Sequence, residues 1–222
     1  MNRIPIIFVV IMVVLIGFSA FAGTTQDLGK WEKGELLLEN YSFEDGLAAW
    51  NLEDGTCCER GGQYTWEIDD DNSQHGEQCL KVVGLIATGT AWHAKITQQS
   101  VSMKSGGMYT IIFWSRAEEP RDVNINIQLQ MDPWTTFHGQ GKTFNLTTDW
   151  VEYSFTFTAN TDVDKQMWVG LAIAQSDVDF WLDNFRYFEG EPEDDMTLEE
   201  VLPVDAKEKL ATQWASVKSG RF

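Results

Sequence analysis

Residues 122–132 read DVNINIQLQMD, and the alternation in this stretch decides the fold class. Every second side chain is apolar, and most of those between carry a side-chain amide. The apolar members are Val123, Ile125, Ile127, Leu129 and Met131, and the polar members are Asn124, Asn126, Gln128, Gln130 and Asp132. A period of two residues predicts a β-strand with one face in a core and the other face lined by amides.

The same period recurs elsewhere in the chain, whereas helical periodicity is nearly absent before residue 196. Further predicted strands cover residues 79–83, 109–117, 153–158, 169–174 and 180–188. Turn signals such as Asp54-Gly55, Ser105-Gly106-Gly107 and Gly139-Gln140-Gly141 separate them. Many short strands joined by polar turns predict an all-β protein, built as an antiparallel sandwich or barrel.

Composition excludes several classes of function. The chain has 222 residues, with 34 acidic and 16 basic side chains and a formal net charge of -18. Because phosphate groups are bound by clustered Lys and Arg, this balance argues against nucleic acid and anionic membrane surfaces as partners. The hydrophobic fraction of 43% is normal for a globular protein, and the length suits one domain or one domain with a tail.

The N-terminal segment predicts export. Arg3 precedes an almost continuous apolar run over residues 4–18, and Ala20-Phe21-Ala22 forms a small-x-small cleavage site. We therefore interpret residues 1–22 as a signal peptide, and expect a secreted protein, extracellular or periplasmic, with no stable membrane insertion after cleavage. The alternative is an uncleaved anchor, because the apolar run approaches the roughly 20 residues that span a bilayer.

The C-terminal segment differs in character from the rest. Residues 189–195 read EGEPEDD, which predicts a solvated linker, and residues 206–218 can form a short helix with Leu210, Trp214 and Val217 on one stripe. The predicted organisation is therefore a lead-in at 23–35, a β-sandwich at 36–188, and an acidic linker with a helical tail at 189–222. The tail is either a helix docked on the domain or frayed, or a recognition or anchoring segment, and the residues do not decide between these readings.

Cys57, Cys58 and Cys79 are the only cysteines. Adjacent cysteines rarely bridge each other, so in an oxidising compartment we expect a disulfide from Cys79 to Cys57 or Cys58, with one thiol left free. A zinc site is the alternative, but no histidine has ligand spacing to this trio.

The amide face of residues 122–132 is the strongest indication of function. Asn126, Gln128 and Gln130 would project at intervals of about 6.6 Å along the strand. An uncharged amide both donates to and accepts from the vicinal hydroxyls of a sugar, without the desolvation cost of an ion. Solvent-facing strands usually carry Lys, Glu and Thr instead, so a row of amides favours a binding face.

Aromatic side chains are the second indication, because the apolar faces of sugar rings pack on indole and phenol rings. In residues 109–117 the alternation places Trp114 and Arg116 on the polar face, where we expect them to join the amides. Trp92, Trp134 and Trp168 lie at strand or loop ends and are weaker candidates, of which Trp92 is included in the predicted carbohydrate site. We assign four tryptophans to the core: Trp50, Trp66, Trp150 and Trp181.

A catalytic interpretation rests on one short acidic stretch. Residues 66–71, WEIDDD, resemble the start of the acidic strand motif of laminarinase-like glucanases. Glu67 and Asp71 would lie roughly 13 Å apart on a flat strand, whereas retaining hydrolysis needs carboxyl groups about 5–5.5 Å apart. We therefore favour a solvated acidic turn over a small glycoside hydrolase, and expect no catalytic residues.

Five motifs in order resemble a carbohydrate-binding module of the CenC type, from the clan of carbohydrate-binding module families 4, 9, 16 and 22. They are Asn40-Tyr41-Ser42-Phe43-Glu44-Asp45-Gly46 with Trp50, His75 to Val82, Gly107 to Ala117, Trp150 to Thr158, and Phe180 to Phe185. The resemblance covers about residues 36–188. It implies a jelly-roll sandwich, like the galactose-binding domains, that binds a polysaccharide in a groove across one sheet without catalysis.

The resemblance also implies a structural calcium ion. The matching ligand positions are Ser42 and His75 through their backbone, and Glu44, Asn72 and Asp183 through their side chains. The expected partner is a polysaccharide of β-linked sugars or a cell-surface glycan, and the expected state is a monomer. The alternative is a structural or adhesion sandwich at the cell surface, without a sugar groove.

Overall fold

The computed structural model describes residues 33–137 and 142–195. This part of the chain is built from β-strands and three short 3-10 turns. The strands are β1 (Asn51–Glu53), β2 (Gln63–Asp69), β3 (Cys79–Ile86), β4 (Lys95–Met103), β5 (Met108–Ala117), β6 (Arg121–Leu129), β7 (Thr143–Leu146), β8 (Val151–Thr158), β9 (Val163–Ala172) and β10 (Phe180–Glu189). The 3-10 turns are η1 (Cys57–Glu59), η2 (Ala91–His93) and η3 (Pro192–Asp194).

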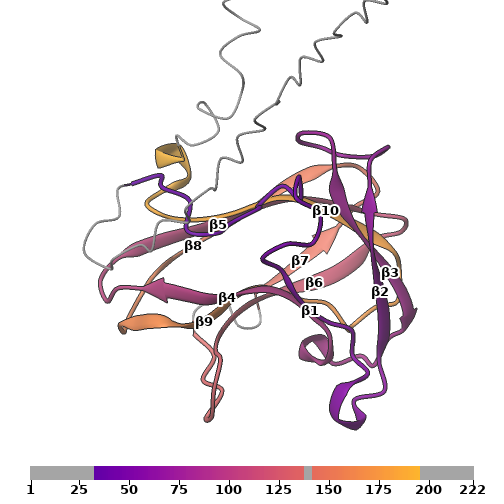
Figure 1. The fold of residues 1–222 in the computed structure, drawn as a ribbon, viewed down its shortest axis with the longest axis horizontal. Coiled ribbons are helices and arrows are strands. Elements are labelled where there is room, and N and C mark those ends of the chain that lie inside the picture. The colour runs from indigo at the N-terminus through magenta and orange to yellow at the C-terminus, as the bar shows by residue number, and fades with distance from the viewer. Residues whose placement is uncertain (1–32, 138–141, 196–222) are drawn as a thin grey trace, which may run out of the picture.

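The strands form two antiparallel sheets of five. One has the order β1-β4-β9-β6-β7 and is here called the front sheet; the other has the order β2-β3-β10-β5-β8 and is called the back sheet. Figure 1 shows the two sheets facing each other, with β4 and β9 in one layer and β5 and β8 in the other. The prediction of an antiparallel β-sandwich is confirmed.

The core lies between the sheets and contains the apolar half of each alternating strand. Val123, Ile125 and Ile127 of β6 are 0–2% exposed. From the back sheet, the ring of Phe113 stacks on that of Phe185, with centroids 5.6 Å apart. Burial of this kind, at about 25 cal/mol per Å² of apolar surface, is the main force that holds the two sheets together.

Two details of the predicted strand and core are wrong. The regular strand ends at Leu129, so Met131 lies beyond it and is 46% exposed rather than buried. Trp150, predicted in the core, is only partly buried and does not belong to it; its ring centre lies 5.9 Å from the guanidinium of Arg116. Trp181 is buried as predicted, on the outer face of the back sheet, where its indole donates to Asp69 and Arg116 lies over it. Trp50 is a core residue as predicted.

The predicted disulfide between Cys79 and Cys57 or Cys58 is also wrong. Cys57 and Cys58 bridge each other in η1, and Cys79 is free and fully buried in β3. The hairpin register explains why: Cys79 pairs with Asp69 at the far end of β2, whereas the two adjacent cysteines precede Gln63 at its beginning. Six strand residues span about 20 Å, far beyond the 4.4–6.8 Å between the Cα atoms of a cystine.

Other predictions fall on residues 1–32 and 196–222, outside the described part of the chain. These are the signal peptide, most of the lead-in and the helical tail. Within the described residues, no helix has the length and apolar character required to cross a membrane.

Candidate functional site

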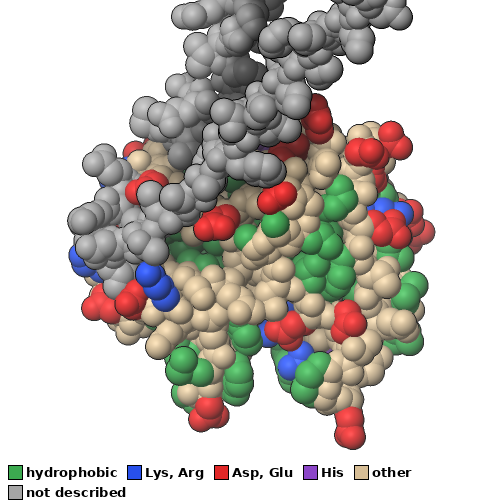
Figure 2. Space-filling model, in the orientation of Figure 1, with side chains coloured by type: hydrophobic (Ala, Val, Ile, Leu, Met, Phe, Trp, Pro, Cys, Tyr) green, Lys and Arg blue, Asp and Glu red, His purple; other side chains and the backbone are tan. Residues whose placement is uncertain are grey.

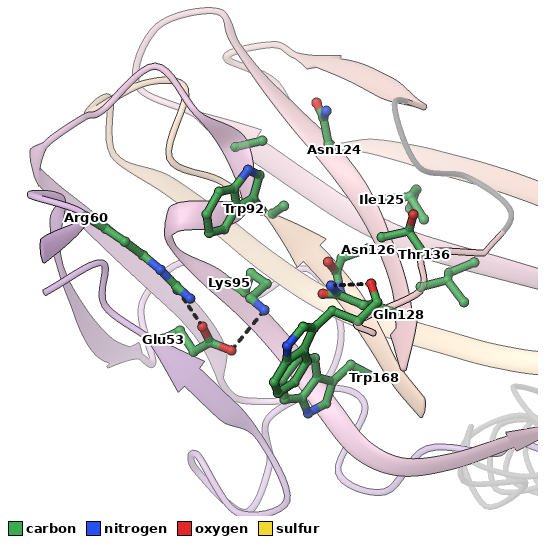
Figure 3. Close-up of a pocket in the computed structure, with 14 residues that line it drawn as sticks. Glu53, Arg60, Trp92, Lys95, Asn124, Ile125, Asn126, Gln128, Thr136 and Trp168 are labelled. Carbon is green, nitrogen blue, oxygen red and sulfur yellow. Dashed lines mark hydrogen bonds and ion pairs between the residues drawn. The ribbon is translucent and has the colours of Figure 1, made fainter. Parts of the chain in front are cut away.

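A cavity of about 550 Å³ opens on the outer face of the front sheet. This volume lies within the 300–1,000 Å³ that is typical of ligand sites. Figure 3 shows the residues around it. The lining residues are Glu53, Arg60, Ala91, Trp92, Lys95, Asn124, Ile125, Asn126, Ile127, Gln128, Trp134, Thr136, Trp168 and Ala172.

Small residues in β9 create the hollow. The last two outward positions of this strand are Gly170 and Ala172, and β9 lies between β4 and β6. Asn126 of β6 pairs with Gly170, and Lys95 of β4 pairs with Ala172. The backbone of β4 approaches Gly170 so closely that a Cβ there would lie 1.9 Å from the carbonyl oxygen of Ile96. Ala172 adds only a methyl group, and the longer side chains of β4 and β6 surround the depression.

A pair of stacked indoles forms one wall. Trp168 lies on the outward face of β9, two residues before Gly170, and Trp134 belongs to the segment that follows β6. Their ring centroids are 5.7 Å apart, with 14° between the planes. Gln128 holds this segment in place, because its Nε2 donates to the carbonyl oxygen of Trp134 at 3.0 Å.

A third indole, Trp92, lies on the other side of Lys95 from Trp168 (Figure 3). It belongs to η2, and its ring makes an edge-to-face contact with His93. Trp92 is 51% exposed and Trp134 is 47% exposed. Large solvent-exposed aromatic rings beside a cavity are ready platforms for an apolar ligand face.

Two buried donors in the cavity lack a partner within the described residues. They are Nδ2 of Asn126 and Nε1 of Trp168. A buried polar group without a hydrogen bond costs about 1–3 kcal/mol, so native proteins retain few of them. Both atoms belong to lining residues, and a small side-chain movement would expose them as donors to the oxygen atoms of a ligand.

Three charged side chains lie beside the indoles. Oε2 of Glu53 is 2.9 Å from Nη1 of Arg60, and Oε1 is 3.1 Å from Nζ of Lys95. Figure 3 shows both ion pairs converging on the single carboxylate. Burial lowers the pKa of Lys95 below its usual value, and repulsion from Arg60 acts in the same direction, while Glu53 opposes the shift.

The structure brings together three of the six residues predicted to bind carbohydrate: Trp92, Asn126 and Gln128. Gln130 lies beyond the end of β6 and does not line the cavity. In the orientation that satisfies both its polar atoms, its side-chain amide bonds the backbone of Ser100 and Lys165 instead.

Trp114 and Arg116 do not join this site, which corrects the prediction. They belong to β5, a strand of the back sheet, so their outward face lies on the opposite side of the sandwich. There the guanidinium of Arg116 lies 4.0 Å from the ring centre of Trp181 and donates to Asn72 at 3.2 Å. Alternation identifies the two faces of a strand, but it does not say which sheet contains the strand.

Trp134 and Trp168, weaker candidates in the sequence, line the cavity together with Glu53, Arg60 and Lys95, to which no pattern in the sequence pointed. Trp168 carried a usable signal, because it shares the outward face of its strand with Gly170 and Ala172. A large aromatic residue followed by two small residues on the same face of a strand indicates a depression in that face with an aromatic side chain at its edge. The three charged residues had no comparable signal, since only the fold brings η1 beside β1 and β4.

The residues assigned to calcium lie around residues 73–78. Oδ2 of Asp183 accepts from the backbone amides of Gln74 and His75, both at 2.8 Å. Oε1 of Glu44 accepts from the amides of Glu77 and Gln78 at 2.9 and 3.1 Å. The loop is thus held between two carboxylates from distant parts of the chain.

The charge at this loop fits a hard cation. Asp183 is fully buried, and burial raises its pKa to about 7, with the nearby carboxylate of Glu44 adding to the rise. The amide of Asn72 is directed away, because it bonds Asp69 and Arg116. No group of three or more acidic, Cys or His side chains gathers within the described residues, so a calcium ion would need backbone carbonyls, such as those predicted at Ser42 and His75.

The carboxylates considered for catalysis have other partners. Glu67 is 3.7 Å from Nζ of Lys81. Asp69 accepts from the indole of Trp181 at 2.6 Å and from backbone amides of the turn that follows β2. Asp71 belongs to that turn, whereas Glu67 and Asp69 belong to β2, so the predicted acidic turn covers only the end of the stretch at residues 66–71.

Comparison with known proteins identifies a family. Residues 36–174 match the model of the family CBM_4_9, which is described as a carbohydrate binding domain. No curated protein matches the chain.

Solved structures with this fold include carbohydrate-binding modules. A family 4 module, from the structure described as "CBM4 structure and function", is 22% identical, with a TM-score of 0.58 over 69% of this chain and 99% of that one. The CBM22-1 xylan-binding domain of Paenibacillus barcinonensis Xyn10C is 16% identical, with a TM-score of 0.54 over 72% and 97% of the two chains. The C-terminal family 22 carbohydrate binding module of Clostridium thermocellum Xyn10B is 13% identical, with a TM-score of 0.52 over 72% of this chain and 96% of that one.

Proposed function

Because this chain belongs to the carbohydrate-binding domain family CBM_4_9, we propose that the cavity on the front sheet is its polysaccharide-binding site. Members of this clan are generally non-catalytic, and the chain is a non-catalytic polysaccharide-binding domain. The observation that carries the placement is the pair of unpartnered buried donors, Asn126 Nδ2 and Trp168 Nε1, between exposed indoles.

In this proposal, some side chains stack on the β-linked sugars and others form hydrogen bonds with them. Trp92 and Trp134 offer exposed ring faces on which the apolar face of a pyranose packs. Asn126 and Trp168 donate hydrogen bonds to sugar oxygens, which removes the cost of two buried donors without a partner. The exposed rings of Trp92 and Trp134 are in place before the ligand arrives, which reduces the ordering cost of association.

A calcium ion held by Glu44 and Asp183, with backbone carbonyls, would stabilise the loop at residues 73–78. Within residues 33–137 and 142–195 neither carboxylate forms an ion pair, and Asp183 is fully buried, which supports this part of the proposal. Calcium supplies positive charge there and favours six to eight oxygen ligands. Its role is structural, since the loop carries none of the residues that line the cavity.

We also propose that the protein is exported through residues 1–22 and acts as a monomer outside the cytoplasm. The apolar run and the small-x-small site support export. Mass spectrometry of the purified protein tests cleavage after Ala22, and size-exclusion chromatography tests the oligomeric state.

Affinity electrophoresis of the full chain tests the binding site. Gels contain soluble β-glucans, xylans or mannans, with and without calcium. We expect retardation by at least one polymer, lost in Trp134→Ala and retained in Trp114→Ala, whose side chain lies on the back sheet. Loss in Trp114→Ala alone would move the site to the back sheet, and unchanged mobility across the panel would favour an adhesion role through protein contacts.

A further inference from the structure

The binding cavity is basic in an acidic protein. Its charged lining residues are Glu53, Arg60 and Lys95, which give a formal charge of +1. The whole chain carries -18. Figure 2 shows acidic side chains distributed over the visible face of the molecule, so a cavity with an excess of cations stands apart from its surroundings.

Glu53 cannot neutralise both of its neighbours. Each of its oxygens already accepts from one cation, Oε2 from Arg60 and Oε1 from Lys95. Among the described residues, the side-chain hydrogen bonds of Arg60 involve Nη1 alone, which also donates to the carbonyl oxygen of His93 at 3.4 Å. A guanidinium carries five N–H donors and an ammonium carries three, so both groups retain donors for a ligand.

The two cations lie beside the aromatic platforms. The guanidinium of Arg60 is 5.0 Å from the ring centre of Trp92, and Nζ of Lys95 is 4.3 Å from that of Trp168. The Arg60 side chain remains 19% exposed, whereas that of Lys95 is 5% exposed. A sugar ring packed against these indoles would therefore place its substituents next to a positive charge.

We propose that this cavity selects an acidic polysaccharide, in which the carboxylate of a uronosyl residue is bound by Arg60 and Lys95. The proposal rests on the proposed function of the same cavity. Burying a lysine is costly unless it is paired, and a neutral sugar would leave the second cation without a counter-charge. A carboxylate matches the fork of an arginine and forms charge-assisted hydrogen bonds, which are about twice as strong as neutral ones.

A matched pair of polymers tests this selection. One is a soluble polysaccharide that contains β-linked glucuronate, and the other is the same polymer with its carboxyl groups reduced to alcohols. We expect the full chain to bind the acidic form at least tenfold more tightly at about 50 mM salt, with the difference shrinking as salt screens the charges. A sulfated polymer without uronate is the third ligand, and binding equal to that of the uronate polymer would overturn the assignment to a carboxylate.

Two substitutions at the ion pairs move the charge of the cavity in opposite directions. Arg60→Gln lowers the formal charge to 0, and we expect it to abolish the preference for the acidic polymer. Glu53→Gln raises the charge to +2, and we expect it to increase that preference several-fold. Arg116→Gln on the back sheet removes the same charge elsewhere and should leave the ratio of the two affinities unchanged; circular dichroism checks that each variant is folded.

The possible results separate the two proposals. Equal affinity for the acidic and reduced polymers, or a ratio that Arg60→Gln and Glu53→Gln do not alter, overturns acidic selection while leaving polysaccharide binding intact. If the chain binds neither of these two polymers nor any neutral polymer of the panel, then acidic selection and polysaccharide binding are both overturned.

Discussion

The indole of Trp134 stacks on that of Trp168, with 5.7 Å between ring centroids and 14° between the ring planes. Trp168 belongs to β9, whereas Trp134 belongs to the segment after β6, which is held to its own strand by hydrogen bonds from Leu129 N to Thr135 O and from Phe137 N to Ile127 O. The stack therefore connects this segment to the sheet. It places an exposed ring above the cavity on a rigid support.

Trp134→Ala tests this platform. We expect binding of the polysaccharide to weaken about tenfold, which corresponds to about 1.4 kcal/mol, because the exposed ring face is lost. Isothermal titration calorimetry measures the change. The matched control is Met131→Ala: its side chain lies in the same segment and is 46% exposed, but it does not line the cavity. Equal losses in the two variants would contradict the platform.

Asn126→Ala separates binding from stability. The Asn126 side chain has an unpartnered donor, so its removal should weaken polysaccharide binding about fivefold to tenfold, whereas the free energy of unfolding should change by less than about 1 kcal/mol. Calorimetry and urea denaturation measure the two quantities. A large loss of stability with unchanged affinity would show that the amide serves the fold and not the ligand.

Removal of calcium should destabilise the domain. With a chelator present, Glu44 and Asp183 would remain close together without a counter-charge, so we expect the melting temperature to fall by several degrees and to recover when calcium is added. Asp183→Asn should remove the response to calcium, and Asp71→Asn, in an exposed turn, should retain it. A melting temperature that is insensitive to both chelator and calcium would exclude the ion.

Thiol titration without reductant tests the cysteine pairing. Burial raises the pKa of Cys79 to about 12, and the side chain is fully buried, so the folded protein should show no reactive thiol at pH 8. In denaturant we expect one thiol per chain, and peptide mapping should assign it to Cys79. A label on Cys57 or Cys58 would instead support the pairing that the sequence suggested.

Gly170→Ala tests the packing beneath the cavity. A Cβ at this position would lie 1.9 Å from the carbonyl oxygen of Ile96, so the strands must shift, and we expect a loss of about 1–3 kcal/mol in the free energy of unfolding. Thermal denaturation measures it. Gly62→Ala is the control, because the nearest atom to its new Cβ is the methyl carbon of Thr88 at 3.2 Å and its backbone neighbours lie at 3.5 Å or more, and we expect a much smaller effect.

Much of the fold followed from local patterns. A period of two residues in β6 identified its buried and outward faces, because successive side chains of a strand must point to opposite sides. The pattern was reliable wherever an apolar face had to be buried, and it failed at Met131, where the strand had already ended. It also identified Asn126 and Gln128, which are fixed on the outward face by their place in the strand.

The sequence by itself determined the class of the fold, its two-faced strands and the character of the amide row. Only the tertiary structure decided which strands share a sheet. That choice separates Trp114 from Asn126, places Trp134 on Trp168, and brings Arg60 and Lys95 to one carboxylate. The reason is physical: alternation is set by the geometry of a single strand, whereas a site is set by hydrogen bonds and packing between segments that lie far apart in the chain.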